Sequence, residues 1–177
     1  MSRHHNYPVH IPRFAVGIRA QEVHAAGRRV WWARRWTAAL EALRLGPRLG
    51  RGRSYALSGQ VTELKLRGPR VTARVLGSRS EPYIATMAFR AAEGAAYDRI
   101  VAALKAQPML VARLLVDDLP TGVEAIFAEA GVPLFPTGGF TEKGGQKLYD
   151  VTTDCSCPDY ANPCKHLAAV YCLLGEE

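Results

Sequence analysis

The sequence lacks any run of about 18 consecutive apolar residues, which is roughly the length that a membrane-spanning helix needs. Its first residues, MSRHHNYPVHIPRF, also lack the apolar core of a secretory signal. We therefore expect a cytoplasmic protein that does not enter a membrane. At 177 residues, the chain can bury one moderate core, with room for a small appended module.

Acidic residues are scarce in one half of the chain only. Residues 1–90 contain 17 Lys and Arg but 4 Asp and Glu, whereas residues 91–177 contain 6 and 12. A GC-rich coding bias explains why Arg outnumbers Lys by 18 to 5, but it does not remove acids from one half. A half with a net charge of +13 favours a polyanionic partner, either nucleic acid or an acidic protein surface.

Familiar signatures of catalysis are missing as well. The stretch GRGRS at 50–54 lacks the spacing and the Lys of a phosphate-binding loop. Asp117 and Asp118 are adjacent carboxylates without a His or a third acid, which favours a solvated surface. No Ser-His-Asp or Cys-His nucleophile arrangement stands outside the cysteine-rich segment near the C-terminus. We therefore expect a binding protein and not an enzyme.

Periodicity predicts helices at both ends of a strand-rich region. An apolar stripe with three- and four-residue spacing predicts a helix over 30–45: Trp32, Trp36, Leu40 and Leu43. Gly46 and Pro47 end it, and 48–54 is expected to be a flexible basic linker. The first thirty residues are expected to form a loosely docked arm. We expect the tryptophans to pack in the core and not to stack on bases, and base stacking stays the more open alternative for Trp31.

A period of two residues predicts three short strands, at 60–66, 70–76 and 83–89, joined by tight turns. They are expected to form an antiparallel meander with one buried face and a basic outer face carrying Lys65, Arg70 and Arg74. Three helices are predicted at 95–107, 109–119 and 121–131. A loop at 133–145 and a strand at 146–153 then lead to the cysteines.

The segment DCSCPDYANPCKH, residues 154–166, holds three of the four cysteines and ends on a histidine. Clustered cysteines in a reducing compartment favour a metal site, and three Cys with one His suit a structural zinc ion. Residues two apart on a strand face the same way, so Cys155 and Cys157 can share one ion with Cys164 and His166. We expect one zinc ion, bound for structure because four protein ligands leave no open position.

A final helix is predicted from the Asn-Pro pair at 162–163, with Asn162 as its N-cap and Pro163 as its first residue. Cys164 and His166 would lie about 200° apart on a regular helix. We therefore expect a distorted start, with regular helix from near His166. An apolar stripe should dock the helix on the rest of the protein: Leu167, Val170, Tyr171 and Leu174. Cys172 is expected to be a buried apolar residue. Loss of zinc should unfold the last thirty residues.

The segment CSCPDYANPCKH resembles the SWIM zinc finger, whose pattern is C-x-C, a variable gap and C-x-H. The upstream stretches RGRSYALSGQVTEL and VTARVLGSRSEPY are similar to the region that precedes the finger in bacterial stand-alone SWIM proteins. The resemblance implies a module that binds DNA or another protein. It also implies a larger partner, such as a Swi/Snf-type helicase-like ATPase.

Together these features predict an α+β protein in three parts: a basic arm and helix at 1–54, a β-meander with helices at 55–133, and a zinc finger at 134–177. The expected function is that of a non-catalytic nucleic-acid-binding accessory protein, a subunit or cofactor of a helicase-like or nuclease-like machine, with DNA the first expectation and RNA the second. The expected phosphate contacts are basic side chains: Arg34, Arg35, Arg48, Arg51, Arg53, Lys65, Arg70, Arg74 and Lys165. The alternative is a protein-interaction adaptor whose zinc finger does not touch nucleic acid.

Overall fold

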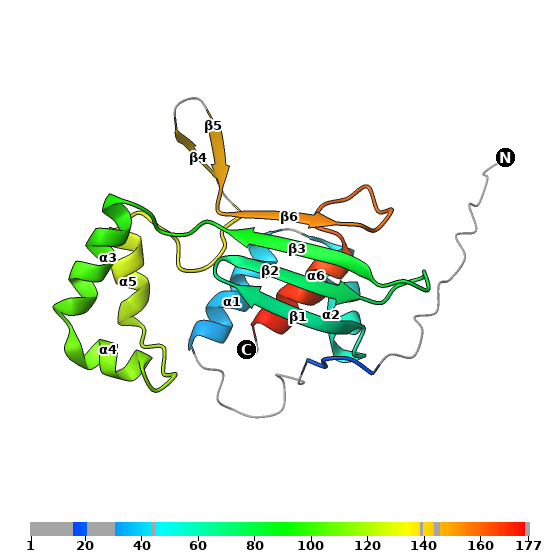
Figure 1. The fold of residues 1–177 in the computed structure, drawn as a ribbon, viewed down its shortest axis with the longest axis horizontal. Helices are drawn as coiled ribbons and strands as arrows, with labels where there is room; N and C mark the ends of the chain where they lie inside the picture. Colours follow the sequence, from blue (N-terminus) through cyan, green and yellow to red (C-terminus); the bar gives the residue numbers. More distant parts are fainter. Residues whose placement is uncertain (1–15, 21–30, 44, 139, 144–145, 176–177) are drawn as a thin grey trace.

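The computed structural model describes residues 16–20, 31–43, 45–138, 140–143 and 146–175. Most of the predicted N-terminal arm lies outside these residues. Of its described part, Ile18 forms a bridge with Val61 on the edge of the sheet. The described residues form an α+β fold, as the sequence predicts (Figure 1). None of the described helices is long and apolar enough to cross a bilayer.

A four-stranded antiparallel sheet in the order β1–β2–β3–β6 is the centre of the fold. Its strands are β1 (Val61–Arg67), β2 (Arg70–Val75), β3 (Tyr83–Phe89) and β6 (Val151–Cys155). The first three strands confirm the predicted meander. The fourth belongs to the cysteine-rich segment and pairs with β3, so that Cys155 lies opposite Ala85. The sheet therefore fixes the first cysteine of the motif.

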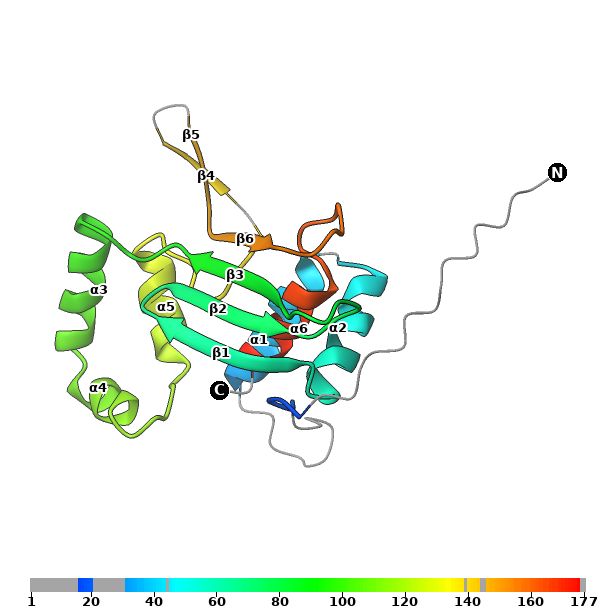
Figure 2. The ribbon, with the colours of Figure 1, turned by 45° about the vertical axis from the view of Figure 1, so that its right-hand side comes forward.

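Three helices cover one face of this sheet (Figures 1 and 2). They are α1 (Trp31–Ala42), α2 (Pro47–Leu57) and α6 (Lys165–Leu174). The main core lies between the helices and the sheet, and the predicted stripe of α6 lies within it, with Leu167, Val170 and Tyr171 0% exposed. No described helix covers the opposite face, which we call the open face (Figure 1).

The prediction of a flexible linker at 48–54 is wrong, because these residues lie inside α2. Gly46 has a positive φ of 57°, which turns the chain, and Pro47 then starts the helix. A buried glycine, Gly52, brings α2 close to Ala168 of α6. Tertiary packing therefore makes this arginine- and glycine-rich stretch helical, although its local propensity is poor.

A second, smaller group of helices lies beside the sheet: α3 (Ala95–Lys105), α4 (Pro108–Leu114) and α5 (Gly122–Glu129). They match the three predicted helices and enclose a small core of their own, with Ile100, Ile126 and Ala130 buried. Trp31 of α1 donates its indole N–H to Leu119 O and packs edge-on against Phe135. Its ring therefore packs within the protein.

The chain between α5 and β6 differs from the prediction. The expected loop at 133–145 contains strand β4 (Phe140–Lys143), which pairs with β5 (Gln146–Tyr149). The expected strand at 146–153 is divided at Asp150, whose buried carboxylate accepts hydrogen bonds from the backbone N–H and the hydroxyl of Thr137. This local bonding separates the β4–β5 hairpin from the central sheet.

The three predicted parts contribute to the same main core. Leu40 comes from the first part, Val75 from the second and Leu167 from the third, and all three are buried in one cluster. The boundaries after residues 54 and 133 stay predictions.

Candidate metal centre

Two of the cysteines are presented by β6 and the residues that continue it. Strand alternation turns Cys155 and Cys157 toward the same side, while Ser156 faces the other side. There the Ser156 hydroxyl accepts a hydrogen bond from the Ile84 N–H at 2.9 Å, and Ser156 N–H donates to Ile84 O at 3.0 Å. The neighbouring strand therefore fixes the orientation of both thiols.

The loop between the two halves of the motif is pinned to β6 by Asn162. The side-chain amide N–H of Asn162 donates to Thr153 O at 2.6 Å. The Thr153 hydroxyl in turn donates to the side-chain oxygen of Asn162 at 2.8 Å. The peptide bond to Pro163 is cis. Asp159 also accepts a hydrogen bond from Ala161 N–H at 3.1 Å. The prediction of Asn162 as N-cap and Pro163 as first helical residue is therefore wrong, because Asn162 bonds to the strand instead.

The helix begins two residues later than the cap signature suggests. Cys164 is the N-cap, with extended backbone angles of φ −85° and ψ 177°, and α6 starts at Lys165. This confirms the predicted distortion at Cys164. Successive residues of a regular helix are rotated by about 100° around its axis. Because Cys164 lies outside the helix, this rotation does not apply to it, and its thiol faces the same point as the His166 ring.

The four side chains form a compact set of metal-binding atoms. Their ligand atoms all lie within 4.8 Å of one another. The Nδ1 atom of His166 is 3.7 Å from the sulfur of Cys164 and 4.0 Å from that of Cys155. Zinc–sulfur bonds of about 2.3 Å in a tetrahedron place neighbouring ligands about 3.8 Å apart. The donor set and its spacing therefore fit one zinc ion.

The three clustered thiols differ in pKa because they hydrogen-bond to one another and are partly buried. A hydrogen bond from Cys155 lowers the pKa of the Cys164 thiol below its ordinary value, and the same bond raises the pKa of Cys155. Burial raises the pKa of Cys157. One negative charge is thus favoured on Cys164 while further charges are opposed. A bound divalent cation offsets this repulsion among thiolates.

Two tyrosines hold the imidazole of His166, which is 3% exposed. The ring of Tyr83 lies 4.7 Å from it and that of Tyr55 lies 5.4 Å from it, between ring centroids. A metal bound at Nδ1 would leave the proton on Nε2, which is buried without a hydrogen-bond partner among the described residues. A Cβ at Gly77 would lie 3.1 Å from Nε2. Sequence reasoning missed these neighbours, since alternation in β3 indicates only that Tyr83 is buried.

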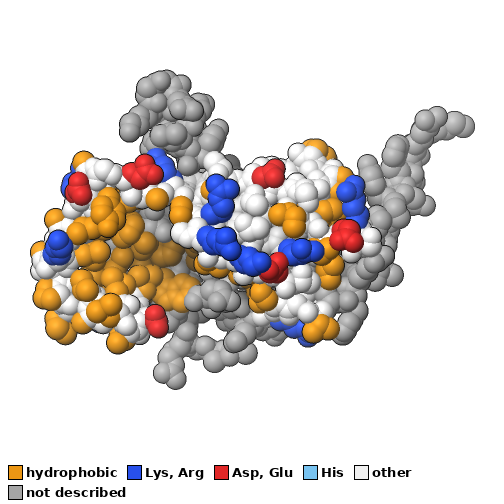
Figure 3. Space-filling view, viewed as in Figure 1, with side chains coloured by type: hydrophobic (Ala, Val, Ile, Leu, Met, Phe, Trp, Pro, Cys, Tyr) orange, Lys and Arg blue, Asp and Glu red, His pale blue; other side chains and the backbone are white. Residues whose placement is uncertain are grey.

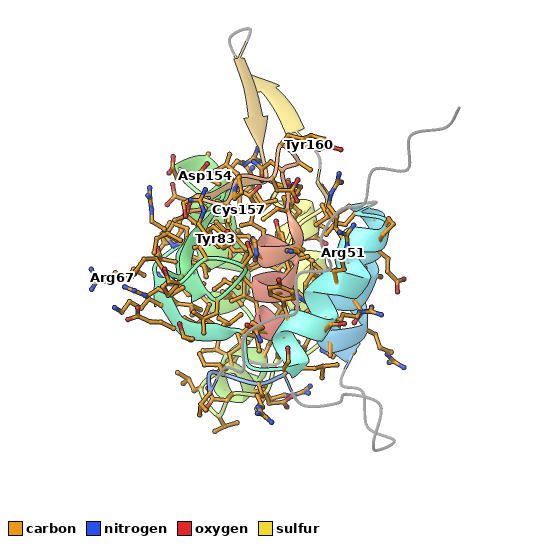
Figure 4. The ribbon with its side chains drawn as sticks, turned by 90° about the vertical axis from the view of Figure 1, so that its right-hand side faces the viewer. Arg51, Arg67, Tyr83, Asp154, Cys157 and Tyr160 are labelled. Atoms are coloured by element: carbon orange, nitrogen blue, oxygen red, sulfur yellow. The ribbon has the colours of Figure 1, made fainter. Side chains whose placement is uncertain are left out.

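The expected phosphate contacts do not gather on one surface. Figure 4 shows Arg51 of α2 on one side of the molecule and Arg67 of β1 on the other. Arg34 and Arg35 lie on α1, and Arg35 forms an ion pair with Glu124 of α5. The remaining expected residues divide among α2 (Arg48, Arg51, Arg53), the open face (Lys65, Arg70, Arg74) and the start of α6 (Lys165). Their contact with nucleic acid stays a prediction.

Several of these cations already have partners within the chain. Arg53 lies 3.9 Å from a Glu41 oxygen, and Lys65 forms an ion pair with Glu63 on the same strand. The Lys165 ammonium lies 5.2 Å from the centre of the Tyr55 ring, which ties it to the surroundings of the metal centre.

Comparison with known proteins agrees with this geometry. Residues 147–171 match the family model of the SWIM zinc finger. The chain is also similar to the uncharacterized protein Rv2102 of Mycobacterium tuberculosis, with 41% identity over 160 residues. The alignment covers 90% of this chain and 54% of that relative, so the chain spans about half the relative's length. No solved structure matches the chain. Residues 147–171 are therefore similar to the SWIM zinc finger, and Cys155, Cys157, Cys164 and His166 are positioned to hold one metal ion.

Proposed function

We propose that this protein binds nucleic acid without sequence preference and acts as a non-catalytic accessory protein. The observation that carries the proposal is the charge of the open face (Figure 3). Its first two strands expose four cations against one carboxylate: Lys65, Arg67, Arg70, Arg74 and Glu63. A sheet face that no described helix covers and that has this excess of positive charge favours a polyanionic partner.

A structural role for zinc supports the non-catalytic part of the proposal. Three thiolates and one imidazole complete a tetrahedron and leave no position for a substrate or a reactive water. The buried ligands Cys164 and His166 also join the finger to the main core. The proposed role of the zinc ion is therefore to stabilise the fold that presents the binding surface.

The proposed partner is a larger DNA-handling machine of the Swi/Snf helicase-like type, with DNA preferred over RNA. The support for this part is the resemblance to bacterial stand-alone SWIM proteins. We also propose a cytoplasmic location, where a reducing environment keeps Cys155, Cys157 and Cys164 as free thiols.

A salt titration of binding tests the nucleic-acid proposal. Zinc-loaded protein is titrated into labelled DNA and RNA at increasing salt, and the dissociation constant is read from fluorescence anisotropy. Affinity should fall steeply as salt rises and should vary little with sequence, because phosphate contacts release counterions but do not read bases. Absence of binding to either polymer at low salt would rule the proposal out.

A protein-interaction adaptor is the second candidate, and an apolar surface favours it. Figure 3 shows hydrophobic side chains gathered on the side of the molecule formed by α3, α4 and α5. Met109, Leu115 and Val116 are 76%, 80% and 72% exposed there. Large exposed apolar patches often mark protein contacts. If the protein bound a partner through this surface and failed to bind nucleic acid at low salt, the adaptor function would replace the first proposal.

A further inference from the structure

Two arginines face each other across the first hairpin of the sheet. In the register of β1 and β2, Arg67 lies directly opposite Arg70, and the two-residue turn of Gly68 and Pro69 joins them. Gly68 has a φ of 54°, which suits this tight turn. Both arginine side chains are exposed, and no carboxylate of the described residues lies within ion-pair distance of either one.

Directly opposed like charges destabilise a strand pair, so this arrangement has a cost without an anion. Cations on an edge strand can be explained as protection against pairing with another sheet, and that accounts for Lys65 and Arg67 on β1. It does not account for Arg70 and Arg74, which lie on the second strand. An anion between the paired guanidinium groups would remove their repulsion and receive hydrogen bonds from both.

The rest of the open face indicates which kind of anion fits. In register with Arg70, β3 and β6 present the short side chains of Ala88 and Thr152, whereas Ile84 and the carboxylate of Asp154 lie farther along the strands. The residues facing outward across the sheet are Glu63, Lys65, Arg67, Arg70, Thr72, Arg74, Ile84, Thr86, Ala88, Thr152 and Asp154. None of these described residues is aromatic. The described strand positions of this face therefore offer no ring on which an unpaired base could stack.

We propose that Arg67 and Arg70 form a phosphate clamp, and that the open face binds the phosphodiester backbone of double-stranded nucleic acid. Arg74 follows Arg70 by four residues along β2, about 13 Å in an extended strand, and extends the contact to a further phosphate. A purely electrostatic surface favours the duplex over the single strand, because the duplex carries the denser charge and releases more counterions per contact. This inference rests on the proposed function and assigns it to one face.

The test measures duplex affinity of the full zinc-loaded chain as a function of salt. If Arg67, Arg70 and Arg74 each contact one phosphate, the slope of log affinity against log salt should be roughly −2.7, or a loss of about 40-fold between 50 and 200 mM. The double variant Arg67→Gln/Arg70→Gln should have a slope of roughly −0.9 and lose only about 3-fold over that range, from a weaker starting affinity. The double variant with Lys at both positions keeps the charge and should recover most of the slope.

Two matched pairs locate the effect. Lys105→Gln/Arg113→Gln removes the same charge from α3 and α4, and should leave affinity within about twofold of the unaltered chain. Arg48→Gln/Arg51→Gln removes it from α2, on the other side of the molecule from Arg67 (Figure 4). The clamp would be overturned if the Arg48→Gln/Arg51→Gln variant lost the salt dependence of its affinity while the Arg67→Gln/Arg70→Gln variant bound normally. Nucleic-acid binding itself would still stand.

Folding and strand preference complete the test. Removing two opposed charges relieves repulsion, so the Arg67→Gln/Arg70→Gln chain should melt no lower than the unaltered protein. Lost binding without lost stability therefore supports the clamp. A lower melting temperature would contradict it, because the proposal requires that the repulsion between Arg67 and Arg70 destabilises the hairpin when no anion is bound. Tighter binding to a single strand than to a duplex of equal length would also overturn it. Failure of the unaltered chain to bind any nucleic acid would defeat the proposed function itself.

Discussion

At the scale of single residues, the metal centre depends on how His166 is held. Its Nδ1 atom faces the thiols, and the rings of Tyr55 and Tyr83 lie against the imidazole. Gly77 leaves space beside Tyr83 and Nε2, where a Cβ would lie 2.5 Å from a Tyr83 ring carbon. These neighbours keep the histidine in the orientation that binding requires.

Gly77→Ala should therefore weaken the zinc site from outside the ligand set. The backbone of Gly77 does not adopt a left-handed φ, so the added methyl group acts through crowding alone. We expect a loss of about 1–3 kcal/mol in the free energy of unfolding and faster zinc release to a chelator. Thermal melting and a zinc-indicator assay measure the two effects. Ser80→Ala, at an exposed position of the same loop, is the control. Equal zinc release from both variants would contradict the proposed crowding.

The ligands themselves could be predicted from the sequence, because spacing and donor chemistry identify them. The role of Asn162 could not. A preferred N-cap type followed by proline indicates a helix start, but its side chain bonds to Thr153 across the loop. The Asn162 side chain could either cap the helix or bond to Thr153, nine residues away. The conformation of the folded loop decides between the two.

At the scale of elements, the close approach of α2 and α6 positions the start of the zinc-binding helix. A Cβ at Gly52 would lie 2.5 Å from the Ala168 Cβ and 2.8 Å from the Ala168 carbonyl carbon. Backbone atoms cannot move aside as a flexible side chain does. The packing of these helices therefore depends on the missing side chain at residue 52.

Two glycines of α2 should respond in opposite ways to the same substitution. Gly52→Ala should lower the free energy of unfolding by about 1–3 kcal/mol because the methyl group meets α6. Gly50→Ala, where nothing lies within 4 Å of the added Cβ, should raise it by about 0.4–1 kcal/mol through the better helix propensity of alanine. Denaturant unfolding of both variants measures this difference. Equal effects would show that α2 does not pack against α6 in solution.

The same element explains why the linker prediction failed. Its composition of Arg and Gly is poor for an isolated helix, so local propensity favours a linker. Tyr55 and Ala56 are nevertheless buried, at 7% and 0% exposure, together with Gly52. The strands were predictable because alternation is a local pattern, whereas α2 depends on a partner over a hundred residues away.

At the scale of the whole molecule, the zinc finger is part of the main core and not a detachable tail. Its strand β6 completes the sheet, and its helix α6 packs against α2 and the sheet. Trp36 of α1 donates its indole N–H to Tyr171 O at 2.8 Å, which joins a third element to the finger. Zinc loss should therefore affect more than the last thirty residues.

Cys157→Ser should remove stoichiometric zinc and destabilise the entire core. We expect the free energy of unfolding to fall by about 4 kcal/mol or more, since loss of a structural metal belongs to the most damaging changes. Tryptophan fluorescence reports the core near Trp36, and elemental analysis reports the metal. The matched variant Cys172→Ser changes a cysteine outside the ligand set and should keep one zinc ion per chain. Unfolding confined to the last thirty residues would contradict the shared core.

The sequence by itself determined the ligand set, the three strands of the meander and the helical middle, because each follows from spacing between near neighbours. Only the tertiary structure decided that 48–54 is a helix, that β6 joins the meander, and that the basic residues divide between two sides of the molecule. Those outcomes depend on contacts between residues far apart in the chain. Side-chain patterns record the face that an element buries, but not the partner that covers it.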